Sequence, residues 1–157
     1  MEEAPSPFGG CMFWEGPVYA TKLNNRLTKG LYVEVLEDEL TASLEYYGKE
    51  VDNFIFMHDN ASSHKAGLVR DWLADKGIKV LEWPAHSPDL DLIEHLWAHL
   101  KRELGKYPHP PKGVLELWER VETEWNKIDA KVCQDLIESM PRRIQAVLKG
   151  KRGHTDY

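Results

Sequence analysis

The sequence predicts an α/β fold with parallel strand pairing. Two short apolar runs, NFIFMH at 53–58 and IKVLEW at 78–83, have the length of buried strands. The segment between them, AGLVRDWLADKG, has the apolar spacing of an amphipathic helix, and Gly77 suits its end. Because a strand, a helix and a second strand in succession favour parallel pairing, both strands are expected in one sheet. The inward residues of the helix are expected to be Leu68, Val69, Trp72 and Leu73.

The residues before the first of these strands are predicted to form a hairpin and a helix. CMFWEGPVYA at 11–20 is typical of two short strands around a Gly-Pro turn. Apolar residues at 33, 36, 40, 44 and 47 follow the helical period, and Gly48 suits a C-terminal cap. The leader MEEAPSPFGG, residues 1–10, is acidic and Pro-rich and holds no apolar strand, so we expect it to be disordered.

After the second strand, helices are predicted to predominate. The segment KYPHPPKG, 106–113, cannot be helix interior because its prolines remove backbone donors and fix φ. Residues 114–149 are expected to form the C-terminal helices, in which Pro141 opens a last short helix capped by Ser139. The apolar stripe of the helix before the proline segment is expected to comprise Ile93, Trp97, Leu100 and Leu104.

Composition excludes several classes of protein. Hydrophobic content is 42% and charged content 29%, which is ordinary for a soluble globular domain of 157 residues. No run approaches the roughly 18 apolar residues of a membrane span. The acidic leader is neither a signal nor a transit peptide. Two cysteines, Cys11 and Cys133, make no disulfide framework and fit a reducing, intracellular compartment.

The net charge of −6 is unevenly distributed. Residues 1–100 carry 8 basic and 17 acidic residues, whereas residues 101–157 carry 12 basic and 9 acidic residues. Most of the basic excess lies in the final segment PRRIQAVLKGKRGHTDY. A basic tail on an acidic body can bind a polyanion. Cations at a solvated helix C-terminus explain the same charges equally well.

Two carboxylates are predicted to meet at one edge of the sheet. Asp59 directly follows the first strand, and Glu94 lies in the first turns of the helix after the second strand. Ligand sites gather at the carboxyl ends of neighbouring parallel strands. A divalent cation such as Mg²⁺ or Mn²⁺ would relieve the repulsion between two such groups. Alternatively, Asp59 caps the segment that follows it and Glu94 favours its own helix N-terminus.

Longer motifs surround both carboxylates. HDNASSH fits the pattern D-N-x-x-x-H, and VLEWPAHSPDLDLIEHLW is close to V-L-x-W-P-x-x-S-P-D-L-N-P-I-E-x-L-W. These motifs resemble the catalytic domain of mariner-type transposases, especially fungal members. The 34 residues between Asp59 and Glu94 are the spacing of one large branch of that superfamily. YPHPPKGVLELWERVETEWNKI and VCQDLIESMPRRIQAVLKGKRGHT extend the resemblance, which runs from about residue 9 to the end of the chain.

The resemblance implies a ribonuclease-H-like (retroviral-integrase-like) mixed sheet flanked by helices, and DNA transposition as the function. Members of the family use an Asp-Asp-Glu triad with two Mg²⁺ ions, or Mn²⁺, to cleave and join DNA. By motif position, Asp59 matches the second aspartate and Glu94 the glutamate. Both are therefore expected to be catalytic and metal-binding. Residues 11–157 are then expected to be a partial DDE catalytic domain.

The resemblance also implies partners. Transposon ends and target DNA are the expected partners, a homodimer is the expected assembly, and the nucleus is the expected location. His64 matches a histidine of the first motif, although a polar residue at a helix start explains it equally well. Candidate nucleic-acid contacts are His64, Lys65, Arg142, Arg143, Lys149, Lys151 and Arg152.

The match is incomplete before residue 11. The first aspartate of the family belongs to a strand upstream of the segment that CMFWEG resembles, and the leader offers no counterpart. We therefore expect the sheet to lack its first strand and residues 1–157 to be inactive in DNA strand transfer. Asp91-Leu92 also stands where family members usually have Asn-Pro, which adds a negative charge near Glu94.

Three other interpretations remain open. The protein is a working enzyme if the missing aspartate is encoded upstream. It is a domesticated module if the basic C-terminal arm binds nucleic acid or a protein partner. An unrelated α/β metal hydrolase would instead use His58, Asp59, His64 and His86.

Overall fold

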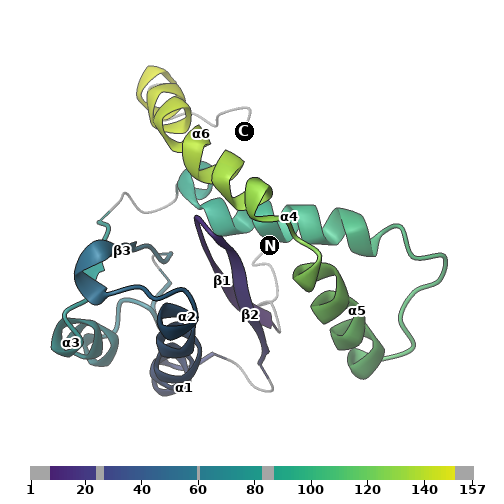
Figure 1. Ribbon diagram of the computed structural model, residues 1–157, viewed down its shortest axis with the longest axis horizontal. Coiled ribbons are helices and arrows are strands. Elements are labelled where there is room, and N and C mark those ends of the chain that lie inside the picture. Colours follow the sequence, from purple (N-terminus) through teal and green to yellow (C-terminus); the bar gives the residue numbers. More distant parts are fainter. Residues whose placement is uncertain (1–7, 24–26, 60, 83–86, 151–157) are drawn as a thin grey trace. The chain divides into compact units, whose positions relative to one another are not determined.

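The computed structural model describes residues 8–23, 27–59, 61–82 and 87–150 (Figure 1). The chain divides into two compact units. The first consists of residues 1–10 and 19–86, and the second of residues 11–18 and 87–157. No helix in the described part is long and apolar enough to cross a membrane.

The N-terminal strands β1 (Phe8–Phe13) and β2 (Gly16–Lys22) form a hairpin as predicted, but the predicted Gly-Pro turn is wrong, because Gly16 and Pro17 already belong to β2. Trp14 and Glu15 make the turn, and Gly16 has a φ of 138°, which favours glycine. Strand β1 already begins at Phe8, so the expected disordered leader is wrong for residues 8–10. Residues 1–7 lie outside the described ranges.

A long helical segment follows the hairpin in the first unit. It comprises α1 (Lys29–Val35), a π-helical turn over Leu36–Leu40 and α2 (Thr41–Tyr46). The Thr28 hydroxyl accepts a hydrogen bond from the Leu31 N–H at 3.2 Å and caps the N-terminus. Gly48 lies just beyond α2 with a φ of 58°, as its predicted capping role requires.

Helix α3 (Gly67–Asp75) packs against α1 and ends before Gly77, whose φ is 71°. The buried face of α3 consists of Val69 and Leu73, whereas Leu68 is exposed and was wrongly predicted to face inward. Glu37 accepts hydrogen bonds from Trp72 Nε1 at 2.7 Å and from Lys76 Nζ at 2.9 Å. These two bonds tie α3 to the π-helical turn.

The two middle strands are much shorter than predicted. They are β3 (Ile55–Phe56) and β4 (Lys79–Val80), and they pair in parallel as expected, with Ile55 opposite Lys79. The expected buried strand 53–58 is wrong in its burial, because Ile55 is 63% exposed. The described strands form two separate two-stranded sheets rather than one mixed sheet. A parallel strand is buried only when neighbouring strands and helices cover it, and among the described strands β3 pairs with β4 alone.

The second unit contains α4 (Leu92–Leu104), α5 (Val114–Asn126) and α6 (Ala130–Lys149). Helix α4 packs against both α5 and α6 (Figure 1). The buried side chains of the three helices include Leu96, Leu100, Val121, Trp125 and Cys133. Trp125 Nε1 also donates a hydrogen bond to the Val18 carbonyl of β2, which ties α5 to the hairpin end that belongs to this unit.

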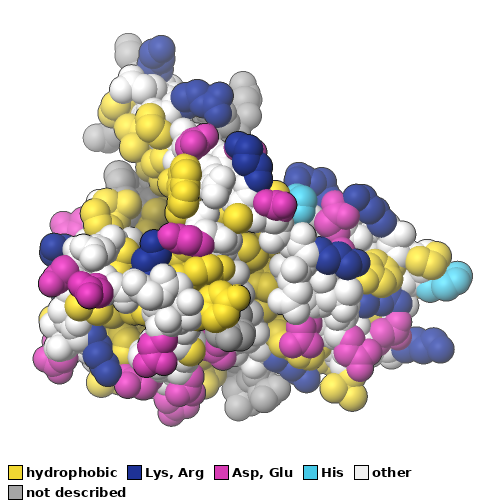
Figure 2. All heavy atoms as spheres, viewed as in Figure 1, with side chains coloured by type: hydrophobic (Ala, Val, Ile, Leu, Met, Phe, Trp, Pro, Cys, Tyr) yellow, Lys and Arg dark blue, Asp and Glu magenta, His cyan; other side chains and the backbone are white. Residues whose placement is uncertain are grey.

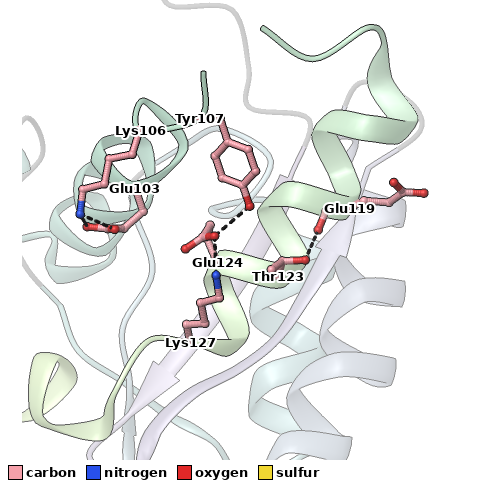
Figure 3. A network of polar contacts seen from close by, with 7 residues as sticks. All are labelled: Glu103, Lys106, Tyr107, Glu119, Thr123, Glu124 and Lys127. Carbon is pink, nitrogen blue, oxygen red and sulfur yellow. Dashed lines mark hydrogen bonds and ion pairs between the residues drawn. The ribbon is translucent and has the colours of Figure 1, made fainter. Parts of the chain in front are cut away.

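Residues 106–113 connect α4 and α5 without helix, as their prolines predict. Tyr107 donates to Glu124 at 2.9 Å, and Lys127 donates to the same carboxylate at 2.8 Å (Figure 3). Lys106 binds both carboxylate oxygens of Glu103 on α4. The start of the connection is therefore fixed to both helices by side chains.

The expectation of a separate short helix after Ser139 is wrong. Helix α6 is continuous through Pro141. The Ser139 hydroxyl does not cap a new helix but donates to the Leu136 carbonyl at 2.6 Å and accepts from Arg143 Nε at 2.6 Å. A side-chain bridge thus spans the turn where proline removes a backbone N–H.

Candidate active site

Asp59 follows β3 by three residues, where the chain turns toward α3. Its Oδ1 accepts a hydrogen bond from the Ala61 N–H at 2.9 Å and a second one from His64 Nδ1. The side chain of Asp59 is 47% exposed, whereas that of His64 is 14% exposed. Both contacts use Oδ1, so Oδ2 has no hydrogen-bond partner within the described residues.

An aromatic stack holds His64 in this position. The ring of Tyr32, a buried residue of α1, stacks on the His64 ring with 3.9 Å between centroids and an interplanar angle of 26°. The His58 ring stacks on His64 from 5.4 Å, and the Tyr32 hydroxyl is hydrogen-bonded to His58 Nδ1 at 3.0 Å. His64 Nε2 is buried without a hydrogen-bond partner among the residues that the structure describes. The orientation of the Asp59 carboxylate therefore depends on α1 as well as on its own loop.

The pKa values of Asp59 and His58 are both lowered, but for different reasons. Burial would raise the pKa of Asp59, but hydrogen bonds from His64 and Ala61 outweigh it and hold that pKa below its usual value. Burial and the neighbouring His64 lower the pKa of His58 to about 4. At neutral pH the site thus holds an ionised carboxylate beside an uncharged His58.

Glu94 lies in the first turn of α4, with an exposed side chain. Its N–H donates to the Asp91 carbonyl at 3.2 Å. The 3-10 turn Pro88–Leu90 precedes the helix, and its proline-bearing loop sets where α4 begins. Glu94 belongs to the second unit and Asp59 to the first.

A buried arginine contacts the segment that carries Glu94. Arg143 of α6 donates to His95 Nε2 at 2.8 Å and to the Asp89 carbonyl at 3.1 Å. Burial, followed by the positive charge of Arg143, holds the pKa of His95 below its usual value. His95 is therefore an uncharged acceptor at neutral pH.

The candidate nucleic-acid contacts differ in their exposure to solvent. Lys65, Arg142 and Lys149 are exposed, whereas Arg143 is only 6% exposed and its guanidinium faces the interior of its unit. Figure 2 shows basic and hydrophobic side chains together along the C-terminal part of α6, where Ile144 and Leu148 are also exposed. Lys151 and Arg152 lie outside the described residues.

Carboxylate oxygens such as those of Asp59 and Glu94 suit a hard divalent cation. Asp59 offers a free oxygen that is already oriented, and Glu94 offers an exposed carboxylate. Across the described ranges, no group of three or more His, Cys, Asp and Glu side chains has a geometry that could hold a metal ion. His86, which the hydrolase interpretation requires, lies outside those ranges.

Sequence comparison identifies the family. Residues 12–113, a range that contains both Asp59 and Glu94, match the family model described as DDE superfamily endonuclease. The chain belongs to this family. Within it, the relatives are transposases of the Tc1/mariner type.

Two nematode relatives show how much of a transposase this chain represents. It is 38% identical to the Tcb1 transposase of Caenorhabditis briggsae over 110 residues, which cover 67% of this chain and 38% of that protein. It is 31% identical to the Tc3 transposase of Caenorhabditis elegans over 157 residues, which cover 96% of this chain and 47% of that protein. The chain therefore spans less than half the length of these relatives.

Solved structures show the same fold. The catalytic domain of Mos1 transposase, solved with raltegravir and Mg, superposes with a TM-score of 0.82 at 23% identity. The match covers 95% of this chain and 76% of that domain. A Mos1 paired-end complex with Mn gives a TM-score of 0.84 at 22% identity. The fold is therefore the mixed α/β, ribonuclease-H-like fold of the Mos1 catalytic domain.

The sequence does not indicate the contacts of two residues in this region. Tyr32 lies on a predicted helix, but nothing in its spacing indicates contact with residues 58 and 64. The basic segment predicts Arg143 as a DNA contact, but its side chain is buried, and two of its hydrogen-bond partners lie 48 and 54 residues earlier in the chain. Only a three-dimensional structure reveals such pairs.

Proposed function

We propose that this chain is the catalytic part of a Tc1/mariner transposase, and that Asp59 and Glu94 are two of the carboxylates that hold Mg²⁺ or Mn²⁺. The observation that carries the proposal is the carboxylate of Asp59. It follows a parallel strand, its Oδ1 is fixed by two donors, and its Oδ2 faces no partner within the described residues. A structural cap would need only the bond from Ala61.

The chemistry assigned to the site is cleavage and strand transfer of transposon DNA. Bound divalent ions would activate the attacking oxygen and stabilise the leaving oxygen. The residues of this chain would orient that site: His64 fixes Asp59, and the first turn of α4 presents Glu94. The Mos1 domain has been solved with Mg and with Mn, which supports the same choice of ions here.

The third carboxylate is proposed to lie outside residues 1–157. In the related transposases, the part that this chain does not span is longer than the part that it does. A strand from that part would pair beside β3 and carry the first aspartate. The exposed Ile55 supports this arrangement, since two paired strands alone make a marginal sheet.

The partners and location follow from the same assignment. Residues 11–157 would form a partial catalytic domain that contacts transposon ends and target DNA as a homodimer in the nucleus. Mos1 complexes described as paired-end and strand-transfer complexes support the DNA partner. Lys65, Arg142 and Lys149 are the described, exposed members of the proposed DNA-contacting set, together with Lys151 and Arg152.

Paramagnetic broadening by MnCl₂ tests the metal site directly. In ¹⁵N spectra of residues 1–157, we expect Mn²⁺ to broaden the amide signals of Ala61 and Glu94 selectively. Asp59→Asn and Glu94→Gln should each abolish the broadening near the substituted residue. Asp135→Asn, at an exposed position of α6, should leave the broadening of the Ala61 and Glu94 signals unchanged. Uniform broadening over the acidic surface would contradict the proposal.

A second function is favoured by the surface of α6. Arg142, Lys149, Ile144 and Leu148 are all exposed there, so the C-terminal part of α6 can serve a module that binds nucleic acid or protein without catalysis. Binding to a random DNA duplex should weaken steeply with salt if phosphates are contacted. Binding that is insensitive to salt would instead indicate a protein partner.

A further inference from the structure

Arg143 is buried on a helix whose neighbouring cations are exposed. It is 6% exposed, whereas Arg142 and Lys149 lie on the surface of α6. Burying a guanidinium is costly unless its donors are satisfied. Its contacts therefore indicate why the chain keeps a cation at this position.

Three donor contacts of Arg143 are directed to specific acceptors. Nε donates to the Ser139 hydroxyl at 2.6 Å within α6. Nη1 donates to the Asp89 carbonyl at 3.1 Å and to His95 Nε2 at 2.8 Å. Because arginine can only donate, His95 Nε2 must be the acceptor, which leaves the proton of the neutral ring on Nδ1.

The two acceptors outside α6 lie on either side of Glu94. Asp89 belongs to the 3-10 turn that leads into α4, and His95 directly follows Glu94. Asp91, the residue before α4, provides no side-chain hydrogen bond to cap the helix. The N-terminal turn of α4 thus has no side-chain cap from Asp91, and it is contacted on both sides of Glu94 by a helix about 50 residues later in the chain.

We propose that Arg143 is a positioning residue for Glu94, which holds the 3-10 turn and the first turn of α4 in place through Asp89 and His95. The functional part of this inference rests on the proposed role of Glu94 as a metal ligand. Arg143 would then support the segment that carries Glu94 and would not contact DNA. Ser139 completes the arrangement, because its hydroxyl fixes the Arg143 side chain across the Pro141 turn.

Amide hydrogen exchange distinguishes the two roles. Lysine keeps the charge but cannot reproduce the planar fork of guanidinium donors. Arg143→Lys should therefore speed the exchange of the amides of residues 94–97 by roughly tenfold relative to those of α5, as expected for one lost charge-assisted hydrogen bond. Arg142→Lys is the matched control on the exposed face and should leave these rates unchanged.

The same variants separate the functional outcomes. With MnCl₂, Arg143→Lys should reduce the broadening at Glu94 but not at Ala61. In a titration of random duplex DNA against salt, Arg142→Gln should lower the slope by about one, and Arg143→Gln should leave it unchanged. An Arg143→Gln slope that falls by one, with wild-type exchange in Arg143→Lys, would overturn the inference.

Two further results keep the inference testable on its own. If Mn²⁺ broadens no amide in the unsubstituted chain, the metal proposal fails, while the exchange rates still decide whether Arg143 positions the first turn of α4. If Arg143→Lys does not fold, His95→Leu and His95→Gln replace it. Leucine removes the acceptor and should speed exchange, whereas glutamine supplies an oxygen and should restore the rate. Equal rates in these two variants would contradict the inference.

Discussion

Contacts between residues far apart in the sequence surround both candidate carboxylates. Tyr32 stacks on His64, which binds Asp59, and Arg143 binds on either side of Glu94. The sequence singles out Asp59 and Glu94 as candidates because their motifs are local. It does not indicate the contacts of Tyr32 with His58 and His64, or those of Arg143 with Asp89 and His95, because no short pattern joins these residues.

Glu124 gives a pH-dependent contribution to stability. Hydrogen bonds from Lys127 and then Tyr107 hold its pKa below the ordinary 4.5. A carboxylate whose pKa is lower in the folded state stabilises the fold above its unfolded pKa, and this contribution is lost as pH falls through the folded pKa. We expect the free energy of unfolding to drop below about pH 4.5, as measured by urea denaturation between pH 3 and 7.

Glu124→Gln is the matching variant for this effect. It should lose roughly 1–2 kcal/mol at pH 7, because a charged acceptor of two donors is replaced by a neutral one. Its remaining stability should depend less on pH below 4.5 than that of the unsubstituted chain. An identical pH dependence in both proteins would show that Glu124 does not contribute it.

The two cysteines should differ in reactivity. Cys133 has no exposed surface, and burial raises the pKa of its thiol to about 11. Cys11 lies on β1 with partial exposure. Because the thiolate is the reactive form, iodoacetamide at pH 8 should modify Cys11 in the native protein and leave Cys133 intact until denaturant is added. Peptide mass spectrometry before and after unfolding measures the labelled fraction of each cysteine. Equal labelling of Cys11 and Cys133 in the native protein would contradict the burial of Cys133.

At the level of elements, long helical patterns were predicted more accurately than strands. Helices α3, α4 and α5 exist where they were predicted, but their buried faces differ in part from the predicted ones. In α4 the buried residues are Leu92, Leu96 and Leu100, so the predicted stripe of Ile93, Trp97, Leu100 and Leu104 is wrong except at Leu100. Strands β3 and β4 were predicted to be longer because an apolar run indicates burial only if the rest of a sheet is present. Pro141 was read as a helix start because a proline is expected there more often than inside a helix.

Pro141 should lower the stability of α6. Proline within a helix removes one backbone hydrogen bond and costs about 3 kcal/mol relative to alanine. Because Pro141 is exposed and the helix is already continuous, Pro141→Ala should raise the free energy of unfolding by roughly 1–3 kcal/mol.

Urea denaturation with Gln145→Ala as the control measures the Pro141 effect. Gln145 is exposed on the same helix, so its substitution should change stability by less than about 0.5 kcal/mol. A destabilised Pro141→Ala protein would mean that the turn bridged by Ser139 and Arg143 requires proline.

At the scale of the whole molecule, catalysis should require more than residues 1–157. In the proposed assignment the third carboxylate lies outside residues 1–157, and the chain spans less than half of its nematode relatives. We expect purified residues 1–157 not to nick supercoiled plasmid DNA with Mg²⁺ or Mn²⁺. A protein extended by an upstream strand that ends in aspartate should nick it, and Glu94→Gln should abolish that activity.

Nicking of plasmid DNA by residues 1–157 alone would contradict this expectation, provided that it depends on Glu94. Nicking by residues 1–157 that disappears in Glu94→Ala would show that two carboxylates suffice or that an unexpected third group completes the site. Nicking that survives Glu94→Ala would indicate a contaminating nuclease. Reading the in-frame codons upstream of Met1 in the mapped transcript provides the extended sequence for the comparison.

The hydrogen bond between Trp125 and the Val18 carbonyl has a consequence for synthesis on the ribosome. The two residues are 107 positions apart. At a translation rate of about 5–20 residues per second, α5 is synthesised roughly 5–20 s after the hairpin that it binds. During that interval its apolar side chains are open to other chains. We infer that nascent chains halted before α5 are the form of this protein that depends most on chaperones.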